Sequence, residues 1–160
     1  MKLKPYDRNA AVKYAKTWAK SRNPVYYDFE STGGDCTNFV SQCLFAGAKI
    51  MNFTPQTGWY YRSLSDRAPA WSSVFYLRNF LTKNVGVGPH AIVAEMKDVL
   101  PGDIVQFCEG NGRCYHSALI TQVSPVILVA AHTYDAIDKS LSDYEYEAVK
   151  FLHIERVYGW

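Results

Sequence analysis

The sequence has no hydrophobic run long enough to cross a membrane. Its longest apolar stretch, from Pro125 to Ala131, is far shorter than the roughly 20 residues that a transmembrane helix needs. The opening MKLKPYDRN also lacks the apolar segment of a secretory signal peptide. We therefore expect a soluble protein without a membrane span, and the sequence leaves open its route to a site outside the cell.

Charge of one sign is not concentrated anywhere in the chain. The 17 basic and 15 acidic residues give a net charge of +2, and the basic residues are spread along the sequence. A nucleic-acid partner is not expected, because such partners bind basic patches or runs. No repeat, low-complexity tract or linker divides the chain of 160 residues. We expect one globular domain, residues 1–160, acting as a monomer.

Cysteine pairs of the CxxC type are also absent. The four cysteines, at positions 36, 43, 108 and 114, do not have the spacing of a zinc ribbon. A metal site of Cys108, Cys114 and His116 can be drawn, but the spacing disfavours it, and we predict no metal or other cofactor. In an oxidising compartment Cys108 and Cys114 can form a disulfide across the loop CEGNGRC, and in a reducing one both stay thiols. The sequence leaves this choice open.

The first half of the chain has helical patterns. Apolar residues recur at intervals of three and four from Asp7 to about Ser21, with Asp7 as the N-cap. A second pattern begins at Cys36 and ends near Gly47. A third helix is predicted from Ser72 or Ser73 through Asn84.

The second half has strand patterns. After Pro101-Gly102 come the short β-branched or aromatic segments DIVQFC, YHSALITQV, VILVAAHT and FLHIERV, separated by turn residues and a polar stretch. Helices followed by an antiparallel meander predict an α+β fold, in which N-terminal helices pack on a C-terminal antiparallel sheet.

The stretch GGDCTNFVSQ, residues 33–42, places Cys36 at the start of the second helix. A helix N-terminus stabilises a thiolate through its free N–H groups and its dipole. We predict that Cys36 is a nucleophile, that Asp35 is the N-cap, and that first-turn N–H groups, including that of Cys36, bind an oxyanion. The alternative is a small buried cysteine, a description that Cys43, between Val40 and Leu44, fits better.

A thiolate that attacks an amide needs a base that can later protonate the leaving amine, and histidine can do both. His90, in a loop, and His153, in the last strand, are expected to be structural or surface residues. His116 opens one strand and His132 closes the next. These two histidines are therefore the candidates for the site.

The register of these two strands decides whether the histidines share a face. A two-residue loop at Ser124-Pro125 would place His116 opposite Thr133 and turn His132 to the other face. Proline cannot adopt the positive φ of the favoured two-residue turns, so we predict a three- or five-residue loop, with His116 opposite His132.

In that arrangement His116 is the base, and His132 orients it through a ring hydrogen bond. Asp135 is the alternative orienting residue, but it lies beyond the end of the strand. We favour His132, because the strand fixes the direction of its side chain.

Several motifs together resemble a known family. GGDCTNFVSQCL, PGDIVQF, HSALIT and AAHTYDAIDKSL, with the opening YDRNAAVKYAKTWAKSRNPVYYDF, are similar to the putative amidase domain family of bacterial and phage proteins. The resemblance covers nearly the whole chain. It implies a papain-like fold related to the NlpC-type and CHAP-type peptidoglycan hydrolases, with Cys36 as nucleophile, His116 as base and His132 as polar third member.

The resemblance implies hydrolysis of bacterial peptidoglycan or its muropeptides, either at the lactyl–L-alanine amide or within the stem peptide, and hence action at the cell wall, outside the cell or delivered by a phage. Trp59, Tyr60, Tyr61 and Trp71 could line a groove for sugar or peptide, or could instead pack over the core. Two other functions remain open: a papain-like acyltransferase and a wall-binding module without turnover.

Overall fold

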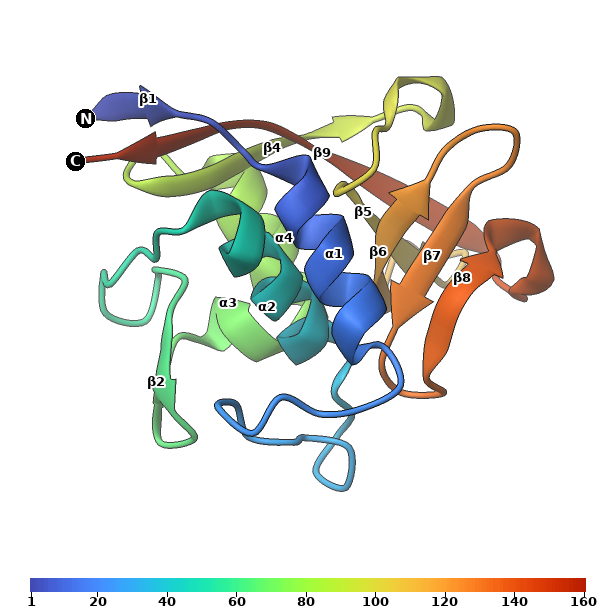
Figure 1. The fold of residues 1–160 in the computed structure, drawn as a ribbon, viewed down its shortest axis with the longest axis horizontal. Coiled ribbons are helices and arrows are strands. Elements are labelled where there is room, and N and C mark those ends of the chain that lie inside the picture. The colour runs from blue at the N-terminus through green and yellow to red at the C-terminus, as the bar shows by residue number, and fades with distance from the viewer.

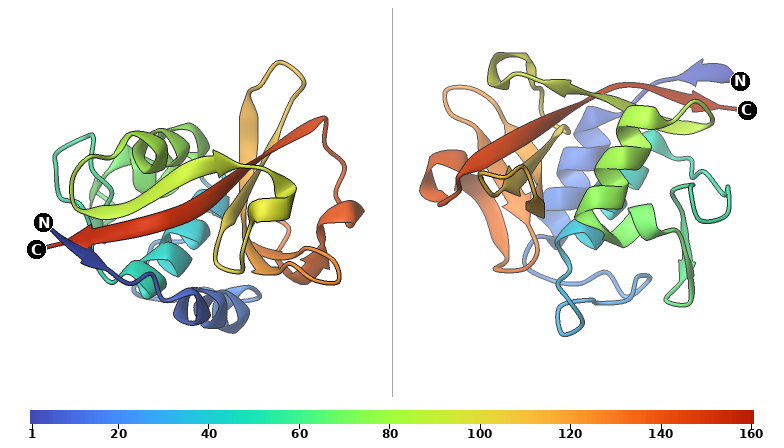
Figure 2. Two further views of the ribbon diagram at one scale, coloured as in Figure 1. Left: turned by 90° about the horizontal axis from the view of Figure 1, so that it is seen from above. Right: turned by 180° about the vertical axis from the view of Figure 1, so that it is seen from behind.

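A computed structural model describes residues 1–160 and has an α+β fold. Helices lie against one face of a seven-stranded sheet, and the sheet bends around them (Figure 1). The last strand runs diagonally across the molecule in both views of Figure 2. The predicted arrangement of helices packed on an antiparallel sheet is confirmed.

The helices begin where local capping predicts. They are α1 (Arg8–Trp18), α2 (Cys36–Ala48), α3 (Pro69–Ser72) and α4 (Val74–Lys83). Asp7 caps α1 by accepting a hydrogen bond from the Ala10 N–H at 2.9 Å. Ser73 caps α4 by accepting from the Tyr76 N–H. The longest helix, α2, has 13 residues, and none is long and apolar enough to span a bilayer.

The main sheet is antiparallel, in the order β1-β9-β5-β6-β7-β8, with β4 also paired to β9. Its strands are β1 (Lys2–Lys4), β4 (Gly88–Ala94), β5 (Ile104–Cys108), β6 (Cys114–Gln122), β7 (Leu128–Ala131), β8 (Ala136–Ser140) and β9 (Ala148–Gly159). A separate ribbon comprises β2 (Tyr61–Ser63) and β3 (Asp66–Arg67).

Three of these strands differ from the sequence prediction. His90 lies in β4 rather than in a loop, and the polar stretch after Asp135 contains β8. β1 pairs with the end of β9, which brings the two chain termini close together (Figure 1). These strands are short or mixed in polarity, so the tertiary pairing rather than the local pattern defines them.

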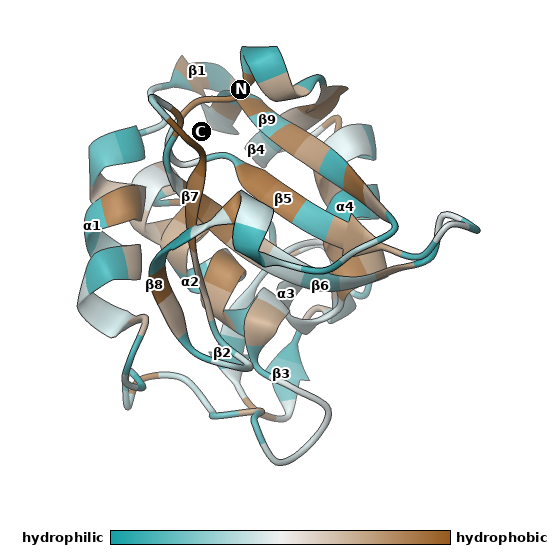
Figure 3. Ribbon diagram, turned by 90° about the vertical axis from the view of Figure 1, so that its right-hand side faces the viewer, coloured by the Kyte–Doolittle hydropathy of each residue, from teal (hydrophilic) through white to brown (hydrophobic).

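Each face of the sheet has its own hydrophobic core. The larger core lies between the helices and the sheet and includes Phe39 of α2, Leu119 of β6 and Leu152 of β9. The smaller core lies on the other face and includes Phe107 of β5 and Ile120 of β6. Figure 3 shows the resulting hydrophobic stretches along β5 and β9 and the alternating hydrophobic and hydrophilic bands of α1. Neighbouring residues of β6 therefore face different cores.

Candidate active site

Cys36 is the first residue of α2, at the end of a glycine turn that the sequence specifies closely. Gly33 and Gly34 both have positive φ, 109° and 104°, values that only glycine adopts readily. A Cβ at Gly34 would lie 3.1 Å from Thr133 Oγ1, so this position also requires a small residue. The turn brings the start of α2 against the segment that follows β7.

The Cys36 thiol is partly exposed and is surrounded by hydrogen-bond donors. Its sulfur lies 3.7 Å from Thr37 Oγ1, and the Ser117 and Thr37 backbone amides lie close enough to lower its pKa. Burial raises the thiol pKa above its ordinary value; these hydrogen bonds lower it in part, and the nearby Asp35 carboxylate raises it. Burial thus opposes the stabilisation of a thiolate that the helix N-terminus is expected to give.

The part of β6 near Ser117 is not paired with β7, and this unpaired edge leaves room for the start of α2. β7 ends at Ala131, and its pairing with β6 reaches only to Leu119 and Ala130. The Ile120 N–H points toward β5 and bonds Asp103 O, so the Ser117 N–H, an odd number of residues away, points to the open edge. The start of α2, with Cys36, packs against this edge at Ser117, the residue that follows His116.

His116 projects from β6 toward the smaller core. Its ring stacks on Phe107, with centroids 5.5 Å apart, and lies 6.4 Å from the ring of Tyr144. Neither ring nitrogen has a hydrogen-bond partner in the protein, and no hydrogen bond joins His116 to Cys36. Burial, with a smaller effect of the Lys139 ammonium, lowers the pKa of His116 to about 4. At neutral pH the imidazole is uncharged and able to accept a proton.

His132 lies on the helix side of the sheet, away from His116. The loop before β7 has five residues, which is one of the two predicted lengths. The register nevertheless differs from the prediction: Gln122 of β6 pairs with Leu128, and Ile120 pairs with Val129, so that β6 has a bulge between Ile120 and Gln122. Continued past the last pair, this register places His132 level with Ser117, and the side chains of Ser117 and His116 point to opposite faces. The predicted pairing of His116 with His132 is therefore wrong.

Both ring nitrogens of His132 already have partners. Nδ1 lies 2.5 Å from Asp35 Oδ2, and Nε2 lies 2.8 Å from the Trp18 carbonyl oxygen. A carbonyl oxygen and an ionised carboxylate only accept hydrogen bonds, so both ring nitrogens are placed as donors. Asp35 and His132 are both 1% exposed, which makes them a buried hydrogen-bonded pair. The predicted ring hydrogen bond from His132 to His116 is absent.

Asp35 stands at the N-cap position of α2 but does not cap the helix through its side chain. Its carboxylate accepts instead from His132, the Phe29 N–H at 2.8 Å and Asn38 Nδ2 at 2.8 Å. Burial alone would raise the pKa of Asp35, but these hydrogen bonds outweigh burial and hold it below its ordinary value. The predicted side-chain cap is wrong, and the first-turn N–H groups of α2 stay free for another acceptor.

Asp135, the alternative orienting residue, is bound by an arginine. Arg22 donates to its two carboxylate oxygens at 2.9 and 3.0 Å, and no histidine contacts it. Arg22 also approaches Glu30 at 3.1 Å and Asp35 at 3.7 Å. Sequence reasoning gave no role to Arg22 or to Thr133, whose hydroxyl accepts from the Asp35 N–H at 3.0 Å. Their bonds to Asp135 and Asp35 join residues 113 and 98 positions apart in the sequence, which no local motif reveals.

The aromatic groove predicted near the site is not present. Trp59 and Trp71 are 0% exposed and form the centre of the larger core. Their indole N–H groups donate to Ser41 Oγ at 3.0 Å and Asn38 Oδ1 at 2.9 Å. Tyr61 is also buried, and Tyr60 packs beside Phe53. The core alternative is therefore the correct one for Trp59, Tyr61 and Trp71.

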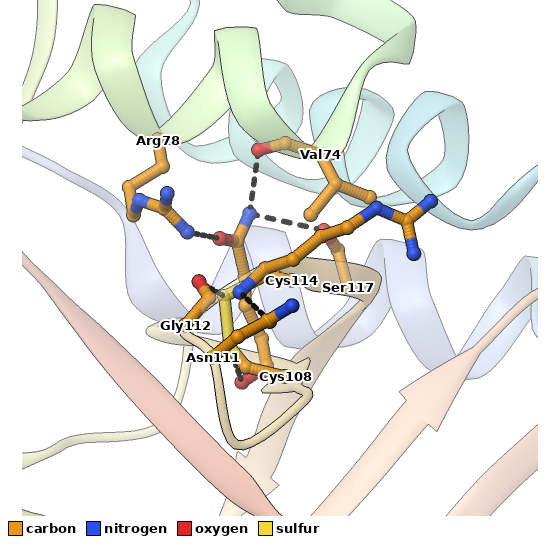
Figure 4. Close-up of a disulfide and its surroundings, with 9 residues drawn as sticks. Val74, Arg78, Cys108, Asn111, Gly112, Cys114 and Ser117 are labelled. Carbon is orange, nitrogen blue, oxygen red and sulfur yellow. Dashed lines mark hydrogen bonds between the residues drawn. A yellow bond between two sulfur atoms is a disulfide. The ribbon is translucent and has the colours of Figure 1, made fainter.

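Cys108 and Cys114 form a disulfide (Figure 4). The bond joins the ends of β5 and β6 just before His116, with the turn that contains Gly112 between them. Because the two sulfurs are bonded to each other, neither is a free thiolate that could bind a metal together with His116. No group of three or more His, Cys, Asp or Glu side chains is arranged to hold a metal ion.

The arrangement brings together a thiol, an uncharged imidazole on the adjacent strand residue and a set of free helix N–H groups. These are the components of acyl transfer through a thioester: a nucleophile, a proton acceptor and donor, and an oxyanion site. The start of α2 lies against β6 at Ser117, the residue after His116, whereas His132 and Asp135 bind groups of the surrounding framework.

Comparison with known proteins identifies relatives. The sequence profile described as "Putative amidase domain" matches residues 5–154. The uncharacterized protein YhbB of Bacillus subtilis is 34% identical over 137 residues, which cover 82% of this chain and 42% of YhbB. The uncharacterized protein YjcM of the same organism is 28% identical over 127 residues, 74% of this chain and 28% of YjcM. The chain thus spans less than half the length of these relatives. No solved structure matches significantly.

Proposed function

Because the chain belongs to the putative amidase domain family, we propose that it is a cysteine-dependent amidase that hydrolyses an amide bond of bacterial peptidoglycan. Family membership supports hydrolysis of a C–N bond. The thiol chemistry and the cell-wall substrate are proposed here. The observation that carries the proposal is the position of the Cys36 thiol at the start of α2, which no side chain caps, beside the backbone of Ser117, the residue after His116.

In the proposed reaction the uncharged His116 imidazole takes the thiol proton as the Cys36 sulfur attacks the amide carbonyl. The carbonyl oxygen gains negative charge and accepts hydrogen bonds from the first-turn N–H groups of α2. The C–N bond then breaks, and the His116 imidazolium gives its proton to the leaving amine. Water, deprotonated by His116, attacks the thioester and releases the acid and the free thiol.

His132 and Asp35 have a supporting role in this proposal. Their hydrogen bond directs the Asp35 carboxylate away from the helix N-terminus, which leaves the oxyanion donors without a side-chain cap. His132 is therefore proposed as a positioning residue that acts through Asp35, in place of a ring contact with His116.

The cut bond is proposed to be the lactyl–L-alanine amide or an amide within the stem peptide. We also propose that the fold is papain-like and related to the NlpC-type and CHAP-type hydrolases. The proposed place of action is the cell wall, outside the cytoplasm. The Cys108–Cys114 disulfide supports the location, because such bonds persist in oxidising compartments.

Digestion of purified peptidoglycan tests the proposal. The wild-type protein, Cys36→Ala and Cys43→Ala are incubated with peptidoglycan in a buffer with a chelator, and soluble products are analysed by mass spectrometry. We expect the rate of fragment release to fall by roughly 10⁴-fold or more in Cys36→Ala, because the nucleophile is lost. Cys43, fully buried on the same helix, is the matched control and should retain activity.

Fragment masses identify the bond that is cut. Release of the same fragments by Cys36→Ala at the wild-type rate would disprove a thiol mechanism. Products joined to an added amine would indicate an acyltransferase, and binding of peptidoglycan without any product would indicate a wall-binding module.

A further inference from the structure

A continuous series of hydrogen bonds connects the Cys36 thiol to a cation on α4. Thr37 Oγ1 lies 3.7 Å from the Cys36 sulfur and 3.2 Å from Ser117 Oγ. Gln106 Nε2 donates to Ser117 Oγ at 3.2 Å, and Gln106 Oε1 accepts from Arg78 Nη1 at 3.2 Å (Figure 4). We name Thr37, Ser117, Gln106 and Arg78 the Cys36 relay.

The donors of the Cys36 relay all point toward the sulfur. A guanidinium only donates, so Gln106 Oε1 faces Arg78, and both amide hydrogens of Gln106 are used by Ser117 Oγ and by the Val74 carbonyl oxygen at 3.0 Å. Because Ser117 Oγ accepts from Gln106, its own hydrogen is free for Thr37 Oγ1. The Thr37 hydrogen is then directed at the Cys36 sulfur.

The middle of the relay is screened from water, whereas its outer end carries an uncompensated charge. Thr37 is 1% exposed, and Ser117 and Gln106 are 0% exposed. Arg78 is partly exposed and makes no ion pair with a carboxylate; its only side-chain hydrogen-bond partner is Gln106. In a buried series of this kind each hydrogen bond polarises the next.

We infer that this series is an electrostatic relay through which Arg78 stabilises the thiolate form of Cys36. Arg78 is thereby a positioning residue for the nucleophile, although it lies on a different element and does not touch the sulfur. The role in catalysis rests on the proposed function, but thiolate stability is a property of the protein alone and can be measured without any substrate.

Several other titratable or charged side chains lie near the thiol and are the same in all variants of the experiment described below. On the α2 side they are Asp35, its partner His132 and Arg22, 3.7 Å from Asp35. On β6 the nearest titratable side chain is His116. None of these residues is altered in the test, so a shift between variants reports the relay.

Alkylation of Cys36 by iodoacetamide as a function of pH tests the inference. The rate is followed by mass spectrometry on the protein with its disulfide intact, in wild type, Thr37→Val, Arg78→Met and Lys83→Met. We expect the pH midpoint to rise by about one unit in Thr37→Val and by about half a unit in Arg78→Met, because donors to the thiolate are weakened. Lys83, on the same helix, is the matched control for the loss of one positive charge and should not shift the midpoint.

Each outcome decides the inference. An unchanged midpoint in Arg78→Met, or an equal shift in Lys83→Met, would overturn the role of Arg78, and an unchanged midpoint in Thr37→Val would overturn the whole relay. Circular dichroism checks the fold of each variant. If Arg78→Met does not fold, Arg78→Gln provides the same loss of charge with a polar side chain and must show the same rise.

Discussion

At the scale of single residues, the packing of His116 determines the pH at which it can act. Its ring is stacked on Phe107, and burial lowers its pKa to about 4. A base must be uncharged, and a lowered pKa keeps the imidazole uncharged until the pH falls to that value. The acidic side of the activity profile should therefore lie well below the ordinary pKa of histidine, about 6.5.

We predict that kcat/KM of the wild-type protein stays nearly constant from pH 7 to pH 5 and falls by half near pH 4. Lys139→Met should move this midpoint upward, because the Lys139 ammonium is the second cause of the lowered pKa. The measurement is the pH profile of fragment release. A midpoint near pH 6.5, the ordinary value, would show that His116 is not the base or that its ring is solvated during the reaction.

At the scale of helices and strands, His132 holds three elements together. It lies just beyond β7, donates to the last residue of α1, Trp18, and pairs with Asp35 before α2. Removing His132 would leave the buried Asp35 carboxylate without one of its hydrogen-bond partners. The position of the α2 start therefore depends on this pair.

His132→Ala should lower the free energy of unfolding by about 3–5 kcal/mol and slow hydrolysis, though less than Cys36→Ala. Asp135→Ala should have a smaller effect on both, because its partner Arg22 is partly exposed and has other carboxylate partners. Urea unfolding and fragment release measure the two effects. A larger loss of activity in Asp135→Ala than in His132→Ala would move the supporting role to Asp135.

The same elements show what the sequence could and could not predict. The caps Asp7 and Ser73 and the glycine turn before Cys36 act locally, so the starts of α1 and α4 and the position of Cys36 at the start of α2 followed from neighbouring residues. The face of His132 depends on a bulge between Ile120 and Gln122, and one inserted residue reverses a side chain's direction. No local pattern specifies that bulge.

At the scale of the whole molecule, Asp103 links the first helix to the last strand. It is 0% exposed and accepts from Arg8 at 2.7 Å, His153 Nδ1 at 2.7 Å, and the Ile154 and Leu100 N–H groups at 2.8 Å each. The aspartate of the PGD motif thus stabilises the fold by joining α1, the turn before β5 and β9.

Asp103→Ala should reduce the free energy of unfolding by about 3 kcal/mol or more, because four donors lose a buried acceptor. Asp66→Ala, which removes an exposed partner of Arg62, is the control and should change it by less than about 0.5 kcal/mol. Thermal unfolding measures both. Equal stability of the two variants would contradict the structural role of Asp103, and the rate of Cys36 alkylation should stay the same in folded Asp103→Ala.

The packing of Trp59 and Trp71 also gives the molecule an optical property. Their rings are 5.0 Å apart in a dry environment, and the Trp71 indole donates to Asn38 in the first turn of α2. The emission maximum of an indole shifts to longer wavelength when water reaches the ring. The emission of these two buried tryptophans, two of the four in the chain, therefore senses whether the first turn of α2 is intact, and it does so without a label and without a substrate.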